Sequence, residues 1–99
     1  LILTTGGTGF SKRDVTPEAT ADIVERRADN LTFAMIANSL QYTPKAMLSR
    51  GIAGIRENTL IVNLPGSPKA VRENLEYAID AIIHGVKILK GDDAECARK

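Results

Sequence analysis

The sequence predicts an α/β domain of three layers, in which helices flank a mostly parallel sheet. The opening residues, "LILTT", form an apolar run that ends at a glycine turn, which is typical of strands covered on both faces in parallel sheets. Three Ser/Thr-Pro pairs further along mark helix starts. Strand-like segments interspersed with helices are the pattern expected of this fold class.

Two more segments predict strands, "IAGIR" at 52–56 and "TLIVNL" at 59–64. Glu57 and Asn58 lie between them and predict a hairpin. Three strands are few for this class, because parallel strands need several neighbours joined by helical crossovers. We therefore expect that an N-terminal βαβ portion is missing from this chain. A small, complete α+β domain is the alternative.

Each predicted helix start combines an N-cap hydroxyl with a proline at the first helical position, where a missing N–H is tolerated. The N-caps are Thr16, Thr43 and Ser67, followed by Pro17, Pro44 and Pro68. The expected helices run from about Pro17 to Arg27, from Lys45 to Arg50 with Gly51 ending it, and from Pro68 to Lys90.

Apolar spacing predicts which face of each helix is buried, and it also predicts a further helix between the first and the short one. The expected buried positions are Ala19, Ile23 and Val24 in the first helix, Phe33, Ile36, Ala37 and Leu40 in the further helix, and Val71, Leu75, Ala78, Ile79, Ile82, Val86 and Leu89 in the last. Residues 91–99 are predicted to form a polar tail.

Composition narrows the possible functions. The 99 residues are 43% hydrophobic and 25% charged, which suits one globular domain. The net charge of +1 is spread without a basic stripe, and aromatic residues are few, so we expect no nucleic-acid partner. No apolar run reaches membrane-spanning length, so no membrane association is expected. The single cysteine, Cys96, fits a reducing compartment and a cytoplasmic location.

The glycine-rich turn after the first strand predicts a phosphate site. Gly6, Gly7 and Gly9 would let an anionic ligand approach the main chain closely, and Thr8 would add a hydroxyl donor. The spacing matches neither the P-loop nor the dinucleotide-binding motif. The alternative is a tight bend that serves the fold alone.

Asp14 follows this turn, two residues before the predicted cap at Thr16. A bound phosphate would repel its carboxylate unless a cation lay between them. Mg²⁺ takes one or two carboxylates together with phosphate oxygens, so Asp14 is the candidate metal ligand. Stabilisation of the helix terminus is the alternative role.

Two other loops are candidates for substrate contact. Gly66 and Ser67 lie in "LPGSP", at the carboxyl end of a predicted strand, where open α/β sheets bind ligands. Ser49 and Arg50 lie in "MLSRG", and an arginine suits bidentate recognition of phosphate or carboxylate. Ser67 as a helix cap only, and Arg50 as the partner of an acid or a helix dipole only, are the alternatives.

Four segments, in this order and spacing, resemble the molybdenum cofactor biosynthesis domain family: "TTGGTGFSKRDVTPEAT", "AMLSR", "AGIR" and "TLIVNLPGSPKAV". Within that family they look most like the molybdopterin adenylyltransferases and the G domains of gephyrin and its plant counterpart. The resemblance covers nearly all of residues 1–90. "KRDVTPEAT" favours the adenylyltransferase branch, since related domains vary the Arg-Asp element.

The resemblance implies transfer of AMP from ATP to the terminal phosphate of molybdopterin, with Mg²⁺ required, in a homotrimer that hands its product to a molybdotransferase. It implies that Gly6, Gly7, Thr8 and Gly9 hold the nucleotide, that Asp14 is catalytic and binds the metal, and that Ser49, Arg50, Gly66 and Ser67 line the substrate pocket. The family domain is longer at its N-terminus, so residues 1–90 would be its C-terminal two-thirds. A non-catalytic molybdopterin-binding or scaffolding module of the same fold is the alternative.

Overall fold

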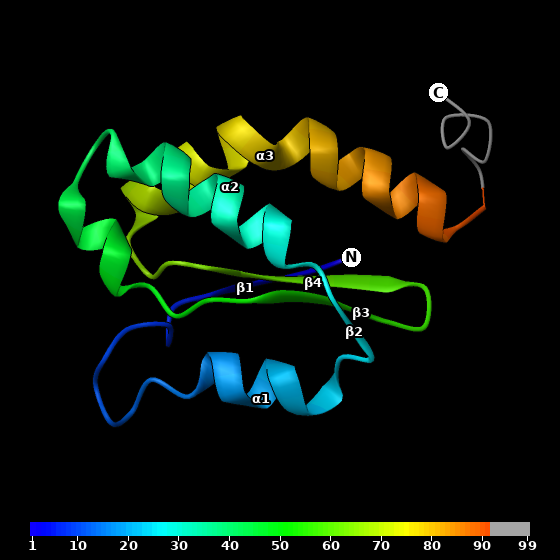
Figure 1. Cartoon of the computed structure of the whole chain (residues 1–99), viewed down its shortest axis with the longest axis horizontal. Coiled ribbons are helices and arrows are strands. Elements are labelled where there is room, and N and C mark those ends of the chain that lie inside the picture. The colour runs from blue at the N-terminus through cyan, green and yellow to red at the C-terminus, as the bar shows by residue number, and fades with distance from the viewer. Residues whose placement is uncertain (92–99) are drawn as a thin grey trace.

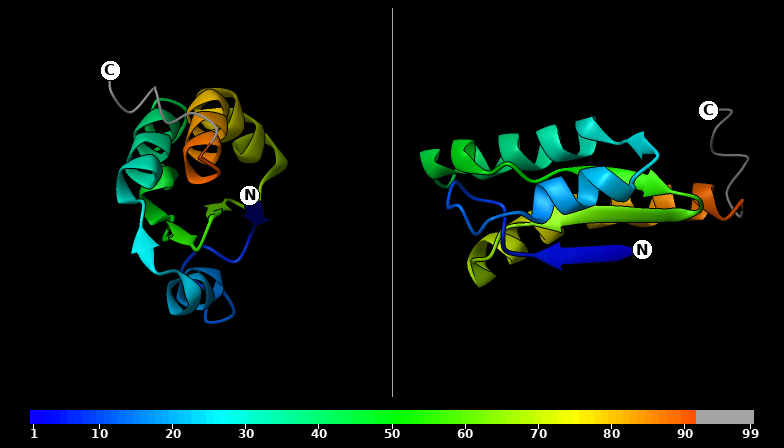
Figure 2. Two further views of the ribbon diagram at one scale, coloured as in Figure 1. Left: turned by 90° about the vertical axis from the view of Figure 1, so that its right-hand side faces the viewer. Right: turned by 90° about the horizontal axis from the view of Figure 1, so that it is seen from below.

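A computed structural model describes residues 1–91 and arranges them in three layers (Figure 1). Two helices cover one face of a four-stranded sheet and a third helix lies on the other face (Figure 2). The three-layer α/β prediction is therefore confirmed. The predicted tail and Cys96, at residues 92–99, lie outside the described residues. The elements are β1 (Ile2–Thr5), α1 (Thr16–Ile23), β2 (Arg26–Arg27), α2 (Asp29–Leu40), the 3₁₀ helix η1 (Pro44–Leu48), β3 (Ala53–Arg56), β4 (Thr59–Leu64) and α3 (Pro68–Leu89).

The strands follow the order β1-β4-β3-β2. β1 runs parallel to β4, with Thr5 opposite Leu64. β3 and β4 form the predicted antiparallel hairpin, and Glu57 turns it with a φ of 52°. β2 adds a further antiparallel edge that the sequence did not predict. The prediction of a mostly parallel sheet is thus wrong for the described residues, because the hairpin and β2 both run antiparallel.

β1 forms the strand that "LILTT" predicts, but its side chains are not buried as expected. Ile2 is 50% exposed and Leu3 is 37% exposed. β1 lies at the edge of the sheet and pairs with β4 alone among the described strands. An apolar strand is buried when it has neighbouring strands on both sides. Among the described residues, β1 has a neighbouring strand on one side, which is β4.

The core lies between β4 and the helices α2 and α3. Val62 and Leu64 on β4 and Ile82 on α3 are almost fully buried. Each such side chain contributes about 1.5 to 3 kcal/mol relative to an exposed one. The predicted face of α3 is confirmed, since Ala78 is buried, Ile79 is half-buried, and Val71, Leu75, Val86 and Leu89 pack against the core cluster.

α1 is shorter than predicted and presents a different face. It ends at Ile23, because Val24 is extended (ψ 145°) and the chain then enters β2. Its N-cap is Val15 rather than Thr16, and no side chain caps it. Pro17 and Thr20 are its buried residues, whereas Ala19 and Ile23 are exposed.

α2 also turns a different face to the core from the one predicted. Thr32 and Met35 are its buried residues, while Phe33 is 64% exposed and Leu40 is 41% exposed. Ala37 is exposed as well. The apolar residues of α2 do recur at helical spacing, but the face that is buried against the core is a different one and includes Thr32.

The other two helix starts are as predicted. Thr43 Oγ1 accepts a hydrogen bond from the Lys45 N–H (3.2 Å), and Ser67 Oγ accepts one from the Ala70 N–H (3.4 Å). The short helix is a 3₁₀ turn that the extended backbone of Ser49 ends (ψ 134°), so Gly51 is not its stop. Among the described helices, none has both the length and the apolar character needed to cross a bilayer.

Candidate functional site

The loops that follow β1 and β4 lie side by side at the carboxyl ends of these two strands. The two strands are parallel, so their carboxyl ends meet there (Figure 1). The Gly6 N–H extends the ladder by donating to the Leu64 oxygen (3.0 Å). A Cβ at Gly66 would lie only 3.3 Å from the Gly6 Cα. The structure therefore brings the two predicted glycine loops together.

Glycines in the first loop are required by the chain's own packing. Gly6 and Gly7 have φ angles of 84° and 71°, which residues with a side chain rarely adopt. A Cβ at Gly7 would clash with the Thr16 hydroxyl, and the Thr16 N–H donates to the Gly7 oxygen (3.1 Å). A Cβ at Gly9 would lie 2.9 Å from Asp14 Oδ2. Close approach by residues of the same chain thus accounts for Gly7 and Gly9 without a ligand.

Asp14 lies inside this loop beside Gly9 and is half-buried. Its Oδ2 accepts a hydrogen bond from the Ser11 N–H (3.0 Å). Its Oδ1 has no hydrogen-bond partner among residues 1–91, which leaves one carboxylate oxygen for a cation. No three His, Cys, Asp or Glu side chains gather into a metal-binding group in the described part of the chain. Asp14 Oδ1 is therefore the carboxylate oxygen that this loop would offer to a cation carried by a phosphate ligand.

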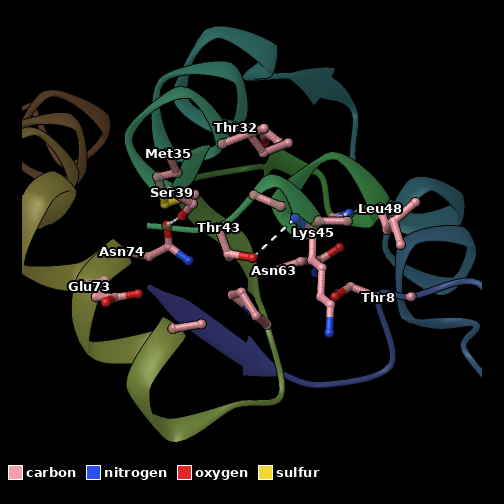
Figure 3. Close-up of a pocket in the computed structure, with 17 residues that line it drawn as sticks. Thr8, Thr32, Met35, Ser39, Thr43, Lys45, Leu48, Asn63, Glu73 and Asn74 are labelled. Carbon is pink, nitrogen blue, oxygen red and sulfur yellow. Dashed lines mark hydrogen bonds between the residues drawn. The ribbon is translucent and has the colours of Figure 1, made fainter. Parts of the chain in front are cut away.

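A pocket of about 290 Å³ opens next to the loop, on the face of the sheet covered by α2 and α3 (Figure 3). Three predicted site residues line it, namely Thr8, Gly9 and Ser49. Thr8 is buried, and its carbonyl accepts a hydrogen bond from the Arg50 N–H (2.8 Å). The other predicted residues lie outside the lining: Gly6, Gly7, Asp14, Arg50, Gly66 and Ser67.

Most polar groups of the pocket come from helix positions that sequence reasoning missed. Asn74 on α3 accepts a hydrogen bond from Ser39 Oγ on α2 (2.9 Å), as Figure 3 shows. Thr32 on α2 is 8% exposed, and its Oγ1 is buried without a hydrogen-bond partner among the described residues. A buried polar atom without a partner is costly, so Thr32 marks where a polar ligand would be stabilised. The sequence signal that could have identified Thr32 and Asn74 is a polar residue among the buried positions of a helix.

Residues of η1 form the mouth of the pocket next to the loop. Thr43, Lys45 and Ala46 belong to the lining, and the Lys45 side chain extends toward Thr8 (Figure 3). Lys45 places a positive charge where the sequence predicted phosphates. Ser49 follows η1, and its Oγ accepts a hydrogen bond from the Gly51 N–H (3.3 Å).

Three predicted substrate residues have other observed contacts. Ser67 caps α3, which is the alternative role considered for it. Gly66 is exposed and borders a shallow second hollow with Thr5 and Arg72. Arg50 turns toward the glycine loop and Glu18, not into the pocket. Pairing with an acid, the alternative considered for Arg50, is thus observed.

Comparison with known proteins identifies relatives of the whole chain. Residues 1–84 match the family model described as "Probable molybdopterin binding domain". The chain is 57% identical over 89 residues to gephyrin from Dictyostelium discoideum, spanning 90% of the chain and 12% of that protein. It is 47% identical over 92 residues to a molybdopterin adenylyltransferase from Helicobacter pylori, spanning 93% of the chain and 52% of that protein.

A solved structure of a relative has the same fold. The molybdopterin biosynthesis enzyme MoaB from Thermus thermophilus superposes with a TM-score of 0.83 at 49% identity, over 91% of this chain and 57% of that one. The chain therefore spans about half the length of the adenylyltransferase and MoaB relatives that it matches. Together with the family match over most of the sequence, these likenesses show that the chain belongs to the molybdenum cofactor biosynthesis domain family, as its motifs predicted.

Proposed function

We propose that this chain is part of a molybdopterin adenylyltransferase, which transfers AMP from ATP to the terminal phosphate of molybdopterin. The observation that carries the proposal is the 47% identity, over 93% of the chain, to a protein named for that activity. The loop and pocket geometry supports it, because a site for two phosphate-bearing substrates needs exposed main-chain amides beside a cavity with polar groups.

In the proposed reaction, an oxygen of the molybdopterin phosphate attacks the α-phosphorus of ATP and pyrophosphate leaves. Such transfers depend on positioning and charge neutralisation, so no nucleophilic side chain is needed. Gly6, Gly7, Thr8 and Gly9 are proposed to hold the nucleotide phosphates. Thr8 and Gly9 belong to the loop and also line the pocket, so they would lie next to the reacting phosphates.

The pocket is proposed to receive the part of a substrate that carries no phosphate. Its apolar walls, which include Met35 and Ile36, would exclude water, and Asn74 and Thr32 would hydrogen-bond to polar edges. Lys45 would contribute positive charge at the mouth. Ser49 keeps its predicted substrate role, whereas Gly66 and Ser67 are proposed to contribute mainly through loop shape.

Mg²⁺ is proposed as a companion of the nucleotide, with Asp14 Oδ1 as the protein ligand. The metal would neutralise phosphate charge when it is bound. Asp14 would also keep the loop in shape through its bond from the Ser11 N–H. In this role Asp14 is the catalytic carboxylate, and its orientation is set before the substrate arrives.

Replacement of Asp14 by Asn tests the proposal. Pyrophosphate release from ATP and molybdopterin should fall about a hundredfold or more, as when one charge-stabilising group is removed from an active site. Nucleotide binding should lose its dependence on Mg²⁺. Asp22→Asn, an exposed carboxylate on α1, is the matched control and should retain activity. An Asp14→Asn variant with wild-type turnover would contradict the role of Asp14.

A non-catalytic molybdopterin-binding or scaffolding module is the alternative function, and the family description includes binding. It predicts molybdopterin binding without pyrophosphate release in the wild-type protein. The same assay therefore separates the two. A homotrimer, hand-over of product to a molybdotransferase, a cytoplasmic location, and residues 1–90 as the C-terminal two-thirds of the domain all remain proposals.

A further inference from the structure

Arg50 links three parts of the glycine loop at once. It lies between η1 and β3, and its Nε donates to the Gly9 oxygen (2.7 Å). Its Nη2 donates to the main-chain oxygen of Asp14 (2.6 Å). Its own main-chain N–H donates to the main-chain oxygen of Thr8 (2.8 Å). One residue that is distant in sequence thus holds three carbonyl groups around the proposed phosphate site.

Glu18 on α1 occupies the outer edge of the same guanidinium. Arg50 Nη1 lies 2.5 Å from Glu18 Oε2, and Nη2 lies 3.4 Å from Oε1. The hydrogen bond from Arg50 lowers the pKa of the Glu18 carboxyl below its ordinary value, so the pair is charged at neutral pH. These contacts use four of the five N–H groups of the guanidinium, so Arg50 cannot bind a phosphate at two points unless it releases a partner such as Glu18.

We propose that Arg50 is a positioning residue: it fixes the Gly9–Asp14 segment of the loop for the phosphates and the metal, and it does not contact the substrate. A loop containing three glycines has high conformational freedom, which must be lost when a ligand binds. Charge-assisted hydrogen bonds to its carbonyls remove that freedom in advance. The effect on nucleotide binding rests on the proposed function, whereas the effect on loop order does not.

Amide hydrogen exchange in the ligand-free, intact protein tests the loop directly. Ser11 and Thr16 donate their N–H groups within the loop, to Asp14 Oδ2 and to the Gly7 oxygen. Arg50→Lys keeps the charge but loses the planar fork, so exchange at these two amides should rise about tenfold or more. Arg56→Lys is the matched control, because Arg56 bonds to the Ile23 oxygen on α1 (2.9 Å) and not to the loop. It should leave both amides unchanged.

Binding of ATP with increasing Mg²⁺ separates positioning from substrate contact. Arg50→Lys should raise the Mg²⁺ concentration for half-maximal ATP binding about tenfold, because Asp14 is no longer held, while ATP binding without metal stays near wild type. Glu18→Gln should shift both the exchange and the Mg²⁺ dependence in the same direction, by a smaller factor. Under direct substrate contact, Glu18→Gln would instead free the guanidinium and strengthen ATP binding.

Each outcome decides the proposal. Unchanged exchange in Arg50→Lys, or stronger ATP binding in Glu18→Gln, overturns it. Faster loop exchange in a protein that binds no ATP supports positioning and refutes the proposed function alone. If Arg50→Lys raises exchange throughout β4 as well, the milder Glu18→Gln variant decides, and unchanged loop exchange in that variant overturns the proposal.

Discussion

The two glycine-containing loops at the edge of the sheet follow neighbouring parallel strands but are held very differently. The loop after β1 has two glycines at positive φ, a buried Thr8, and carbonyls bound by Arg50. The loop after β4 is exposed at Gly66 and Ser67, and within residues 1–91 Ser67 Oγ bonds only to the first turn of its own helix. Similar sequence patterns therefore lead to one loop fixed by tertiary contacts and one fixed locally.

This difference has a consequence for a phosphate site. A loop ordered in advance loses little entropy when it binds a ligand, and its amides already point in fixed directions. The first loop meets that condition through residues as far along the chain as Arg50. The second loop lies close to the first, since Gly66 packs against Gly6, but fewer tertiary contacts hold it in place.

Gly7→Ala should give the largest loss of stability and tests the fixed loop. The new Cβ would clash with the Thr16 hydroxyl, and alanine would also have to adopt the positive φ of Gly7. We therefore expect the free energy of unfolding, measured in urea, to fall by about 2 to 4 kcal/mol. Gly66→Ala is the matched variant in the other loop. Its Cβ would need a shift of only a few tenths of an ångström from Gly6, so its cost should stay below about 1 kcal/mol.

The double variant Gly7→Ala, Thr16→Ala separates the two causes of this loss. Removing the Thr16 hydroxyl relieves the clash but leaves the positive φ, so part of the lost stability should return. Equal costs for Gly7→Ala and Gly66→Ala would show that the two loops do not differ as described.

Ser67→Ala tests the locally held loop and should have a smaller effect. The lost N-cap bond to the Ala70 N–H should lower the free energy of unfolding by about 1 kcal/mol. Circular dichroism melting measures it, with Ser67→Asn as a control that restores a capping acceptor. Because this loop is not connected to Arg50, exchange at the Ser11 and Thr16 amides should stay unchanged. Faster exchange there would mean that the loops are coupled.

Local sequence signals predicted what local chemistry determines. The hairpin at Glu57, the caps at Thr43 and Ser67, and the buried face of α3 depend on neighbouring residues, and all are confirmed. The face of α2 was wrong because the position of the sheet, not the strongest apolar spacing, decides whether Met35 or Phe33 is buried.

The candidate site was predicted only in part for the same reason. The motifs predicted the family, which is confirmed, and a site at the loop, which stays a prediction. Thr32 and Asn74 reach the pocket through the packing of α2 on α3. Arg50 was a candidate for substrate contact, yet its observed contacts to Gly9 and Glu18 depend on tertiary structure. No spacing rule in the sequence distinguishes a phosphate-binding arginine from one that binds carbonyl groups.

A change in pH should have the smallest effect on stability, and it tests how the Glu18 carboxylate contributes to the loop held by Arg50. The hydrogen bond from Arg50 lowers the pKa of Glu18 from its ordinary 4.5, so the carboxylate stabilises the fold above pH 4.5 and loses this contribution as the pH falls through its lowered pKa. The urea midpoints of wild type and Glu18→Gln should therefore differ at pH 7 and converge below pH 4.5. Asp22→Asn removes an exposed carboxylate from the same helix, one that makes no hydrogen bond within residues 1–91, so its urea midpoint at pH 7 should stay near that of wild type. Added salt should reduce the difference at pH 7, because Glu18 is exposed. A difference that persists unchanged at pH 3 would mean that the charge of the Glu18 carboxylate is not what stabilises the fold.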